Sequence, residues 1–324
     1  AGFFINRHQE NDMANTRGKS IDNTHLSIDT AEDRIMIHRD YIAHCLRWSH
    51  VLKFLLQKHQ YKGARMLDVG CGIDVPMARM MLSNRVAPLE YIGVDYNHST
   101  KFKLDWFENT RFKPTTFGSI DFADDKCVWF DEAKDGQTCI NIKGDNGEDY
   151  FSIPNIITCF EVLEHIEPEH VVRTLKRIKY IMQKAKDFEG MVPTFFMSTP
   201  NWNVTDTADN HVNEMKNEAL GWLLEELGFA IVDQFGTFAS KRDYAHLLNN
   251  VYGPEVYRVF DRLNDYYDSN LAAVLFAPLF PREARNCFWQ LTIAKEGYER
   301  KYAPIAEVRE PWTSSENWKE LADV

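Results

Sequence analysis

Three side chains that can bind a metal ion or move a proton stand close together at Glu161, Glu164 and His165. Their i, i+3, i+4 spacing would place all three on one face of a helical turn. A fourth such side chain, His211, follows later in the chain and can approach from the opposite wall. Carboxylate and imidazole donors together suit divalent ions such as Mg²⁺, Mn²⁺ or Zn²⁺. We therefore predict a metal site built from Glu161, Glu164, His165 and His211, in which Glu161, His165 and His211 also act in catalysis.

A bound cation would help a hydroxyl group to lose its proton and become a nucleophile. Alkyl hydroxyls ionise poorly near neutral pH, and a metal ion can lower the pKa of a bound water from about 15.7 to about 7. Two adjacent oxygens of a diol or catechol could chelate the ion and be held in line for reaction. Two other interpretations stay open. In one, the site is metal-free and His165 or His211 is a general base. In the other, these side chains only shape a pocket floor or cap a helix.

The second chemical feature is a glycine turn after a short apolar strand, Leu67–Gly72. Glycines directly after a strand let the backbone turn tightly and approach a ligand closely. Ligands of parallel sheets bind at the carboxyl ends of the strands. Asp95 ends the next predicted strand, where its carboxylate could accept hydrogen bonds from both hydroxyls of a ribose. On its own, this pattern fits a dinucleotide or S-adenosylmethionine (SAM).

Asp74 favours SAM over a dinucleotide. The dinucleotide fingerprint has a third glycine at the helix N-terminus, where the pyrophosphate binds. Here Gly72 is followed by Ile73 and Asp74. A carboxylate at this place would repel a pyrophosphate, whereas SAM has no phosphate and carries a positive sulfonium. The sequence therefore counts against a nicotinamide-dependent oxidoreductase.

Strands and helices alternate regularly from residue 65 onward. The apolar runs predict strands over 66–69, 91–94, 115–120, 155–160, 194–197, 229–235 and 288–293, and helices over about 39–60, 75–83, 168–186 and 218–227. Such alternation indicates a parallel sheet covered by helices on both faces.

Five segments occur in the order typical of class I SAM-dependent methyltransferases: Leu67–Gly72, Val94–Asp95, Phe160–Ile166, Ser198–Asn201 and Leu223–Phe229. The chain resembles that family over about residues 65–235 and in its last strand. The resemblance implies an α/β fold with a Rossmann-like doubly wound sheet of about seven strands. The last strand would be antiparallel, with a helical insert before it.

The resemblance also implies a cofactor and its binding residues. SAM would contact Asp68, Gly70, Cys71, Gly72, Asp95, Tyr96, Asp121 and Phe160, with Asp95 on the ribose and Asp121 beside the adenine amine. The Glu161–His165 segment is similar to those of the small-RNA 3′-terminal 2′-O-methyltransferases and the ubiquinone-biosynthesis O-methyltransferases. These groups act on a 2′,3′-diol and a catechol. We therefore predict SAM-dependent methylation (EC 2.1.1 type) of a hydroxyl on a small molecule or nucleotide, assisted by a divalent metal.

Two inserts and two terminal segments complete the predicted organisation. Residues 123–152 place apolar runs on either side of Asp145-Asn146-Gly147, which predicts a hairpin. Residues 241–282 combine aromatic side chains with arginines and predict a helical lid over the substrate. A satellite core or a contact between copies is the alternative for this second insert. The expected domain limits are a flexible arm at 1–36, the methyltransferase domain at 37–300 and a C-terminal tail at 301–324.

The net charge bears on which partners the protein can bind, and the cysteine content bears on its redox compartment. The chain has 37 Lys and Arg against 48 Asp and Glu, a net charge of −11, which disfavours an extended grip on duplex phosphates. An RNA or DNA nucleotide as acceptor, or a SAM-binding protein without turnover, remain the alternatives. No apolar run could span a bilayer. The six cysteines form no CxxC pair, which favours a reducing, cytoplasmic compartment. The inserts and the Asn/Asp-rich composition resemble viral methyltransferases.

Overall fold

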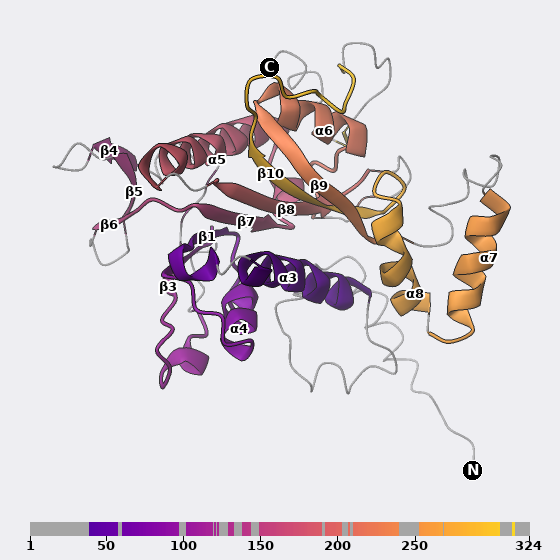
Figure 1. The fold of residues 1–324 in the computed structure, drawn as a ribbon, viewed down its shortest axis with the longest axis horizontal. Helices are drawn as coiled ribbons and strands as arrows, with labels where there is room; N and C mark the ends of the chain where they lie inside the picture. Colours follow the sequence, from indigo (N-terminus) through magenta and orange to yellow (C-terminus); the bar gives the residue numbers. More distant parts are fainter. Residues whose placement is uncertain are drawn as a thin grey trace.

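The computed structural model describes residues 39–57, 60–96, 102–118, 120, 122, 129–132, 138–143, 149–189, 192–202, 207, 210–239, 253–267, 269–304 and 313–314. Its centre is a seven-stranded sheet in the order β3-β2-β1-β7-β8-β10-β9 (Figure 1). The strands are β1 (Arg65–Val69), β2 (Glu90–Val94), β3 (Thr115–Phe117), β7 (Ile156–Phe160), β8 (Thr194–Pro200), β9 (Phe229–Phe238) and β10 (Asn286–Ile293).

The sheet is parallel from β3 through β8, and β10 is antiparallel to both of its neighbours, β8 and β9. This arrangement confirms the predicted Rossmann-like doubly wound fold with an antiparallel last strand. It also brings the carboxyl ends of β1, β2, β7 and β8 to one edge of the sheet. That edge is where ligands of such folds bind.

Helices cover both faces of the sheet. Helices α3 (Arg39–Gln57) and α4 (Pro76–Ser83) lie on one face, and α5 (Pro168–Glu189) and α6 (Asn217–Glu226) lie on the other (Figure 1). Short 3₁₀ turns are η1 (Gln60–Gly63), η2 (Asp105–Phe107), η3 (Leu163–His165) and η5 (Ala277–Leu279). Within the described residues, no helix is both long and apolar enough to cross a membrane.

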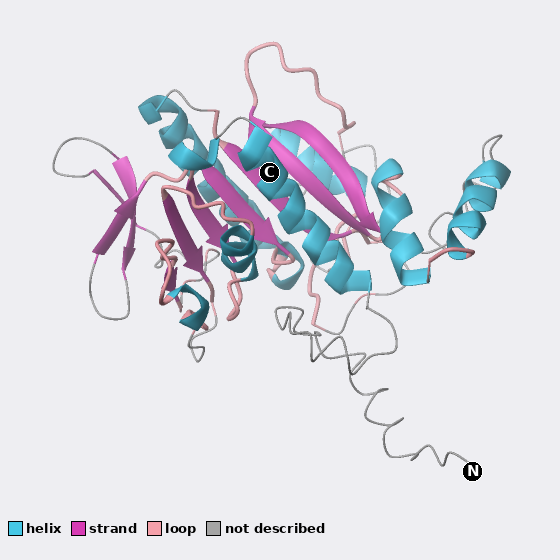
Figure 2. Cartoon of the chain, turned by 60° about the horizontal axis from the view of Figure 1, so that its bottom comes forward, coloured by secondary structure: helices cyan, strands magenta, loops and turns pink. Residues whose placement is uncertain are grey.

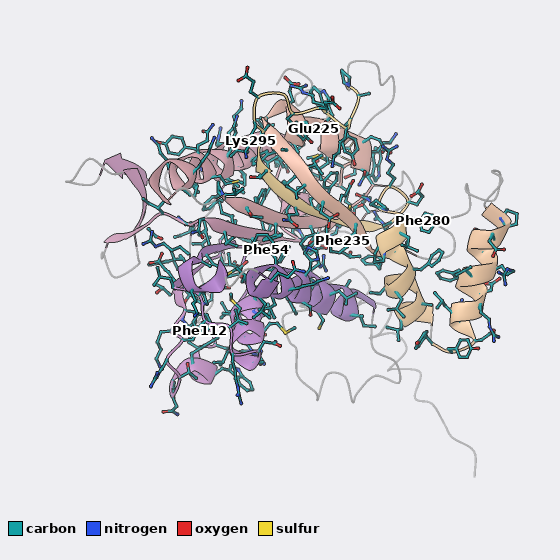
Figure 3. The ribbon with its side chains drawn as sticks, viewed as in Figure 1. Phe54, Phe112, Glu225, Phe235, Phe280 and Lys295 are labelled. Atoms are coloured by element: carbon teal, nitrogen blue, oxygen red, sulfur yellow. The ribbon has the colours of Figure 1, made fainter. Side chains whose placement is uncertain are left out.

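The side chains of the strands alternate between two cores, as the pleat of a strand requires. Met66 packs with α3 and α4, whereas its neighbour Leu67 packs with α5 and α6. Aromatic rings fill much of the α3 side, where Phe196 and Phe288 lie 5.9 Å apart between ring centroids. Figure 3 shows Phe54 and Phe235 in the layer between α3 and the sheet.

The two predicted inserts lie at opposite ends of the molecule (Figure 2). In the first, β5 (Thr138–Lys143) pairs with β6 (Asp149–Ser152) as an antiparallel hairpin, and β4 (Trp129–Glu132) adds a strand that the sequence did not predict. The second insert contains α7 (Gly253–Asn264) and α8 (Ser269–Phe276). Its helices enclose a small satellite core, and α8 packs beside α3 and β9.

The chain beyond residue 300, which the sequence set apart as a tail, returns to the domain. The buried carboxylate of Glu225 on α6 accepts hydrogen bonds from the backbone N–H groups of Lys301 (2.8 Å) and Tyr302 (3.0 Å). It also accepts one from the Tyr298 hydroxyl, at 2.8 Å. Figure 3 marks Glu225 on this outer helix. The Tyr302 ring belongs to the same core as α5 and α6, so residues just beyond 300 pack against this side of the sheet.

We expect Gly70→Ala to destabilise the fold more than Gly297→Ala. Both glycines have positive φ, +72° and +80°, and an alanine at either place would cost about 1–2 kcal/mol in left-handed strain. A Cβ at residue 70 would clash with Val162 Cγ2, whereas no described atom lies within 4 Å of one at residue 297. Overpacking should therefore add about 1–3 kcal/mol at residue 70 only. Urea unfolding measures both losses, and equal losses would contradict this close packing.

Candidate active site

The glycine turn joins the carboxyl ends of β1 and β2. The N–H groups of Gly70 and Cys71 donate to the Val94 carbonyl at 2.9 and 3.1 Å. The Gly72 N–H donates to Asp95 Oδ2 at 2.9 Å. Gly70 and Gly72 both have positive φ, a conformation that glycine adopts without a steric penalty. The turn therefore holds Asp95 against the backbone at the point where a cofactor ribose is expected.

Asp68 is committed to neighbouring strands. Its buried carboxylate accepts hydrogen bonds from the Tyr91 hydroxyl on β2 and from Thr158 Oγ1 on β7, the latter at 2.7 Å. Burial raises the pKa of Asp68 to about 6, although both hydrogen bonds act in the opposite direction. Burial also raises the pKa of the adjacent Cys71 thiol well above its usual range, so this thiol is a poor nucleophile. Asp68 thus ties β1 to both of its neighbours.

The other predicted cofactor residues fall into different surroundings. Tyr96 is 67% exposed directly after Asp95, whereas Phe160 packs against the α3 core. Asp121 lies outside the described residues. Asp74, whose charge was expected to repel a pyrophosphate, is buried and forms an ion pair with Lys103 at 2.9 Å. Its charge is therefore balanced within the protein.

Glu161 follows β7 in a left-handed conformation, with φ +56°. One of its carboxylate oxygens accepts hydrogen bonds from the buried Arg47 guanidinium of α3 and, at 2.7 Å, from Ser198 Oγ of β8. Asn286 Nδ2 of β10 donates to both oxygens, at 3.0 and 2.8 Å. The predicted helical turn is the 3₁₀ turn η3, which begins only at Leu163. Glu161 therefore precedes the turn and does not share a helical face with Glu164 and His165.

Glu164, His165 and His211 come together. One ligand atom from each side chain lies within 4.8 Å of the others, and the two imidazole centroids are 4.9 Å apart at 78°. The loop that carries His211 is tied to η3 because the N–H groups of Val212 and Asn213 donate to the Glu164 carbonyl, at 2.9 and 3.1 Å. Thr199 Oγ1 of β8 donates to the Glu164 carboxylate at 3.2 Å. The cluster therefore lies at the carboxyl ends of β7 and β8.

The two glutamates have opposite electrostatic surroundings. Burial, together with the charge of Glu161, raises the pKa of Glu164 well above its usual range. Burial also acts to raise the pKa of Glu161, but the Arg47 guanidinium and the hydrogen bonds from Asn286 and Ser198 outweigh it and lower this pKa. Pairs of carboxylates whose pKa values are driven apart are typical of sites that bind or transfer protons and cations.

Both histidines have a hydrogen-bond partner at Nδ1. Nδ1 of His165 lies 3.0 Å from the Asn210 carbonyl, and Nδ1 of His211 lies 2.6 Å from Glu214 Oε1. A carbonyl can only accept, so the Nδ1 of His165 carries the proton and its Nε2 has the lone pair. Burial lowers the pKa of His165. Its imidazole is therefore neutral near pH 7 and able to accept a proton or bind a cation.

Several residues of this site were not predicted from the sequence. Arg47 and Asn286 hold Glu161, and Arg285 forms an ion pair with the buried Glu214 at 2.8 Å. Burial acts to raise the pKa of Glu214, but its contacts with His211 and Arg285 lower it overall. Only Glu214 left a signal in the sequence, because it stands three residues after His211 and could bond to it on a local turn.

Comparisons with known proteins identify the family of the chain. The model of the family described as "Methyltransferase domain" matches residues 38–234, which is more than half of the chain. No curated protein matches the sequence. Among solved structures, the chain is similar to magnesium protoporphyrin IX methyltransferase from Synechocystis PCC 6803 with bound SAH, at 11% identity and a TM-score of 0.43, over 90% of this chain and 96% of that one.

Two further structures show the range of these similarities. The methyltransferase domain of bacterial CtHen1-C is 13% identical, with a TM-score of 0.42, over 78% of this chain and 100% of that one. The 1,6-didemethyltoxoflavin-N1-methyltransferase from Burkholderia thailandensis is 12% identical, with a TM-score of 0.41, over 91% of this chain and 93% of that one. The family match and the order of the strands together identify the chain as a member of the class I SAM-dependent methyltransferases, which are transferases of EC 2.1.1 type.

Proposed function

We propose that the methyl acceptor is a hydroxyl oxygen on a small molecule or nucleotide, and that Glu164, His165 and His211 hold or deprotonate it. One observation carries this proposal: the three side chains converge within 4.8 Å at the carboxyl ends of β7 and β8. The glycine turn lies at the same edge of the sheet. A hydroxyl held by the cluster would therefore lie at the same edge of the sheet as the cofactor.

The cofactor is assigned to the glycine turn. SAM supplies an electrophilic methyl group on a positively charged sulfonium. Asp95, held by the Gly72 N–H, is proposed to accept hydrogen bonds from the ribose, and the exposed Tyr96 ring to lie beside the adenine. Gly70 and Cys71 line the turn. Asp68 contributes by fixing the position of β1 between β2 and β7.

The donor set of the cluster fits a divalent cation. One carboxylate and two imidazoles suit ions such as Mn²⁺ and Zn²⁺, and less closely Mg²⁺. Burial and the charge of Glu161 raise the pKa of Glu164, and a nearby cation would act in the opposite direction by stabilising the ionised form of this carboxyl. When bound, a divalent ion lowers the pKa of a coordinated hydroxyl. We leave Glu161 out of the ligand set because its oxygens accept hydrogen bonds from Arg47, Ser198 and Asn286.

The histidines are assigned the proton transfer. In the form of the mechanism without a metal ion, the Nε2 lone pair of the neutral His165 can accept the acceptor's hydroxyl proton as the oxygen attacks the methyl group. A bound cation would use this same lone pair, and the ion would then lower the pKa of the hydroxyl instead. His211 stands across from it and can bind a second oxygen or share this role. The reaction requires the oxygen, the methyl carbon and the sulfur to be in line, so holding the acceptor in place is the main task of the cluster. The insert with α7 and α8 is proposed to close over the acceptor as a lid.

Removing the carboxylate of Asp95 should weaken cofactor binding. A hydrogen bond to a charged group contributes about 1.5–3 kcal/mol, so Asp95→Ala should reduce the affinity for S-adenosylhomocysteine about tenfold to a hundredfold. Isothermal titration calorimetry measures this change. Asp105→Ala, which removes an exposed carboxylate near the start of η2, is the matched control. Equal affinities of the two variants would argue against the assigned ribose contact.

Removing divalent cations with EDTA should distinguish a metal-assisted reaction from one in which His165 or His211 acts as the base. Purified protein is incubated with methyl-labelled SAM and a cell extract, with and without EDTA, and the products are separated into nucleic acid, protein and small molecules. We expect label in the small-molecule or nucleotide fraction, its loss with EDTA, and its return when Mn²⁺ is added in excess. Label that resists EDTA would refute the metal and leave His165 and His211 as bases. SAM binding without any label would indicate a protein that binds the cofactor but does not turn over.

Loss of a cluster histidine should lower turnover without harming the cofactor site. His165→Ala and His211→Ala are each expected to reduce the labelling rate by about 10²–10⁴-fold, the usual contribution of a positioned acid or base. His170→Ala on α5 should retain wild-type activity. S-adenosylhomocysteine affinity, measured in parallel, should be unchanged in all three variants. Wild-type rates in both cluster variants would remove these histidines from the mechanism.

A further inference from the structure

Glu214 has an unusual position beside the proposed site. Its side chain is fully buried, and its two carboxylate oxygens face two different partners. Oε1 lies 2.6 Å from His211 Nδ1, and Oε2 lies 2.8 Å from Nη1 of Arg285. A carboxylate buried beside a guanidinium is held in its ionised form by that charge. An ionised carboxylate has no proton to donate, so the proton between Glu214 and His211 belongs to the imidazole.

We propose that Glu214 is a positioning residue that fixes His211 as the tautomer protonated at Nδ1. In that tautomer Nε2 has the lone pair, so it is the nitrogen available to a hydroxyl proton or a cation. Histidines that bind metals commonly donate their other N–H to a carboxylate, which orients the ring and makes it a better donor. This inference rests on the proposed function of His211, but the tautomer itself can be measured independently of any reaction.

The backbone around Glu214 is also held on two sides. Its N–H donates to Ser314 Oγ at 2.8 Å, and its carbonyl accepts from the Ser314 N–H at 2.8 Å. Next to it, Thr313 Oγ1 donates to Asn213 Oδ1 at 2.9 Å. On the other side, the same loop is bound to the Glu164 carbonyl through Val212 and Asn213. Residues near the C-terminal end of the chain therefore help to hold the carboxylate that orients His211.

Glu214→Gln is the variant that separates orientation from packing. A glutamine fills nearly the same volume, but its amide can donate as well as accept. It can therefore bond to either tautomer of His211, and it removes the ion pair between Glu214 and Arg285. Glu225→Gln is the matched control. It removes another buried carboxylate that binds the C-terminal part of the chain, but it does not contact His211.

The first readout is the imidazole ¹⁵N spectrum of the metal-free 324-residue chain, with the His211 signals assigned by a His211→Asn variant. We expect the wild type and Glu225→Gln to show His211 protonated at Nδ1, and Glu214→Gln to show a large share of the Nε2–H tautomer. The second readout is Mn²⁺ affinity, which should fall about 10–100-fold in Glu214→Gln and stay unchanged in Glu225→Gln. Thermal melting of all variants checks that each is folded.

The outcomes are distinguishable. A wild-type His211 protonated at Nε2 would overturn the inference without any variant. An unchanged tautomer in folded Glu214→Gln would also overturn it. If the wild type does not bind Mn²⁺ but its Nδ1–H tautomer is lost in Glu214→Gln, the positioning role of Glu214 is supported and only the metal in the proposed function fails. Loss of the tautomer in Glu225→Gln as well would reassign the effect to general loosening of the C-terminal contacts, against the inference.

Discussion

The ion pair between Arg47 and Glu161 is the interaction on which the carboxyl edge of the sheet depends. It joins helix α3 to the residue after β7, and Ser198 and Asn286 extend it to β8 and β10. Breaking a buried ion pair by removing one partner typically costs about 3–5 kcal/mol, because the remaining charge stays buried. These contacts also hold Glu161 in a left-handed backbone conformation that is unfavourable for a residue with a side chain.

This pairing also explains why two glutamates so close in sequence behave differently. Glu161 has the guanidinium, and its pKa is lowered. Glu164 is buried next to the resulting negative charge, and its pKa is raised. The guanidinium of Arg47 thus favours the ionised form of Glu161, while Glu164 lies beside His165 and His211. The division of roles is imposed by α3, which lies far from both glutamates in the sequence.

The fold could be predicted from the sequence because the strands of a parallel sheet are buried on both faces and form nearly continuous apolar runs. The predicted strands at 66–69, 91–94 and 155–160 match β1, β2 and β7 to within one residue at either end. The glycine turn was equally predictable, since Gly70 and Gly72 adopt backbone conformations that favour glycine. The meeting of His211 with Glu164 and His165 could also be anticipated, because their segments follow adjacent parallel strands.

The contacts that organise the site could not be predicted from spacing. Arg47 and Glu161 are 114 residues apart, and Asn286 and Glu161 are 125 apart; no local pattern links them. The regular spacing of Glu161, Glu164 and His165 suggested one helical face, but the turn begins after Glu161. The charge of Asp74 was interpreted without its ion-pair partner Lys103. In each case the missing information was a tertiary partner.

The position of β10 has a consequence for how the protein is made. Of the strands that the structure describes, β10 is the last to be synthesised, yet it lies between β8 and β9 and supplies Asn286 to Glu161. A nascent chain that ends before β10 leaves β8 and β9 with unpaired edges, which favour association with other chains. Its Glu161 also has fewer of the contacts that hold it. The ribosome must therefore complete β10 before the carboxyl edge of the sheet can assemble, and a truncated product would expose surfaces that chaperones and proteases act on.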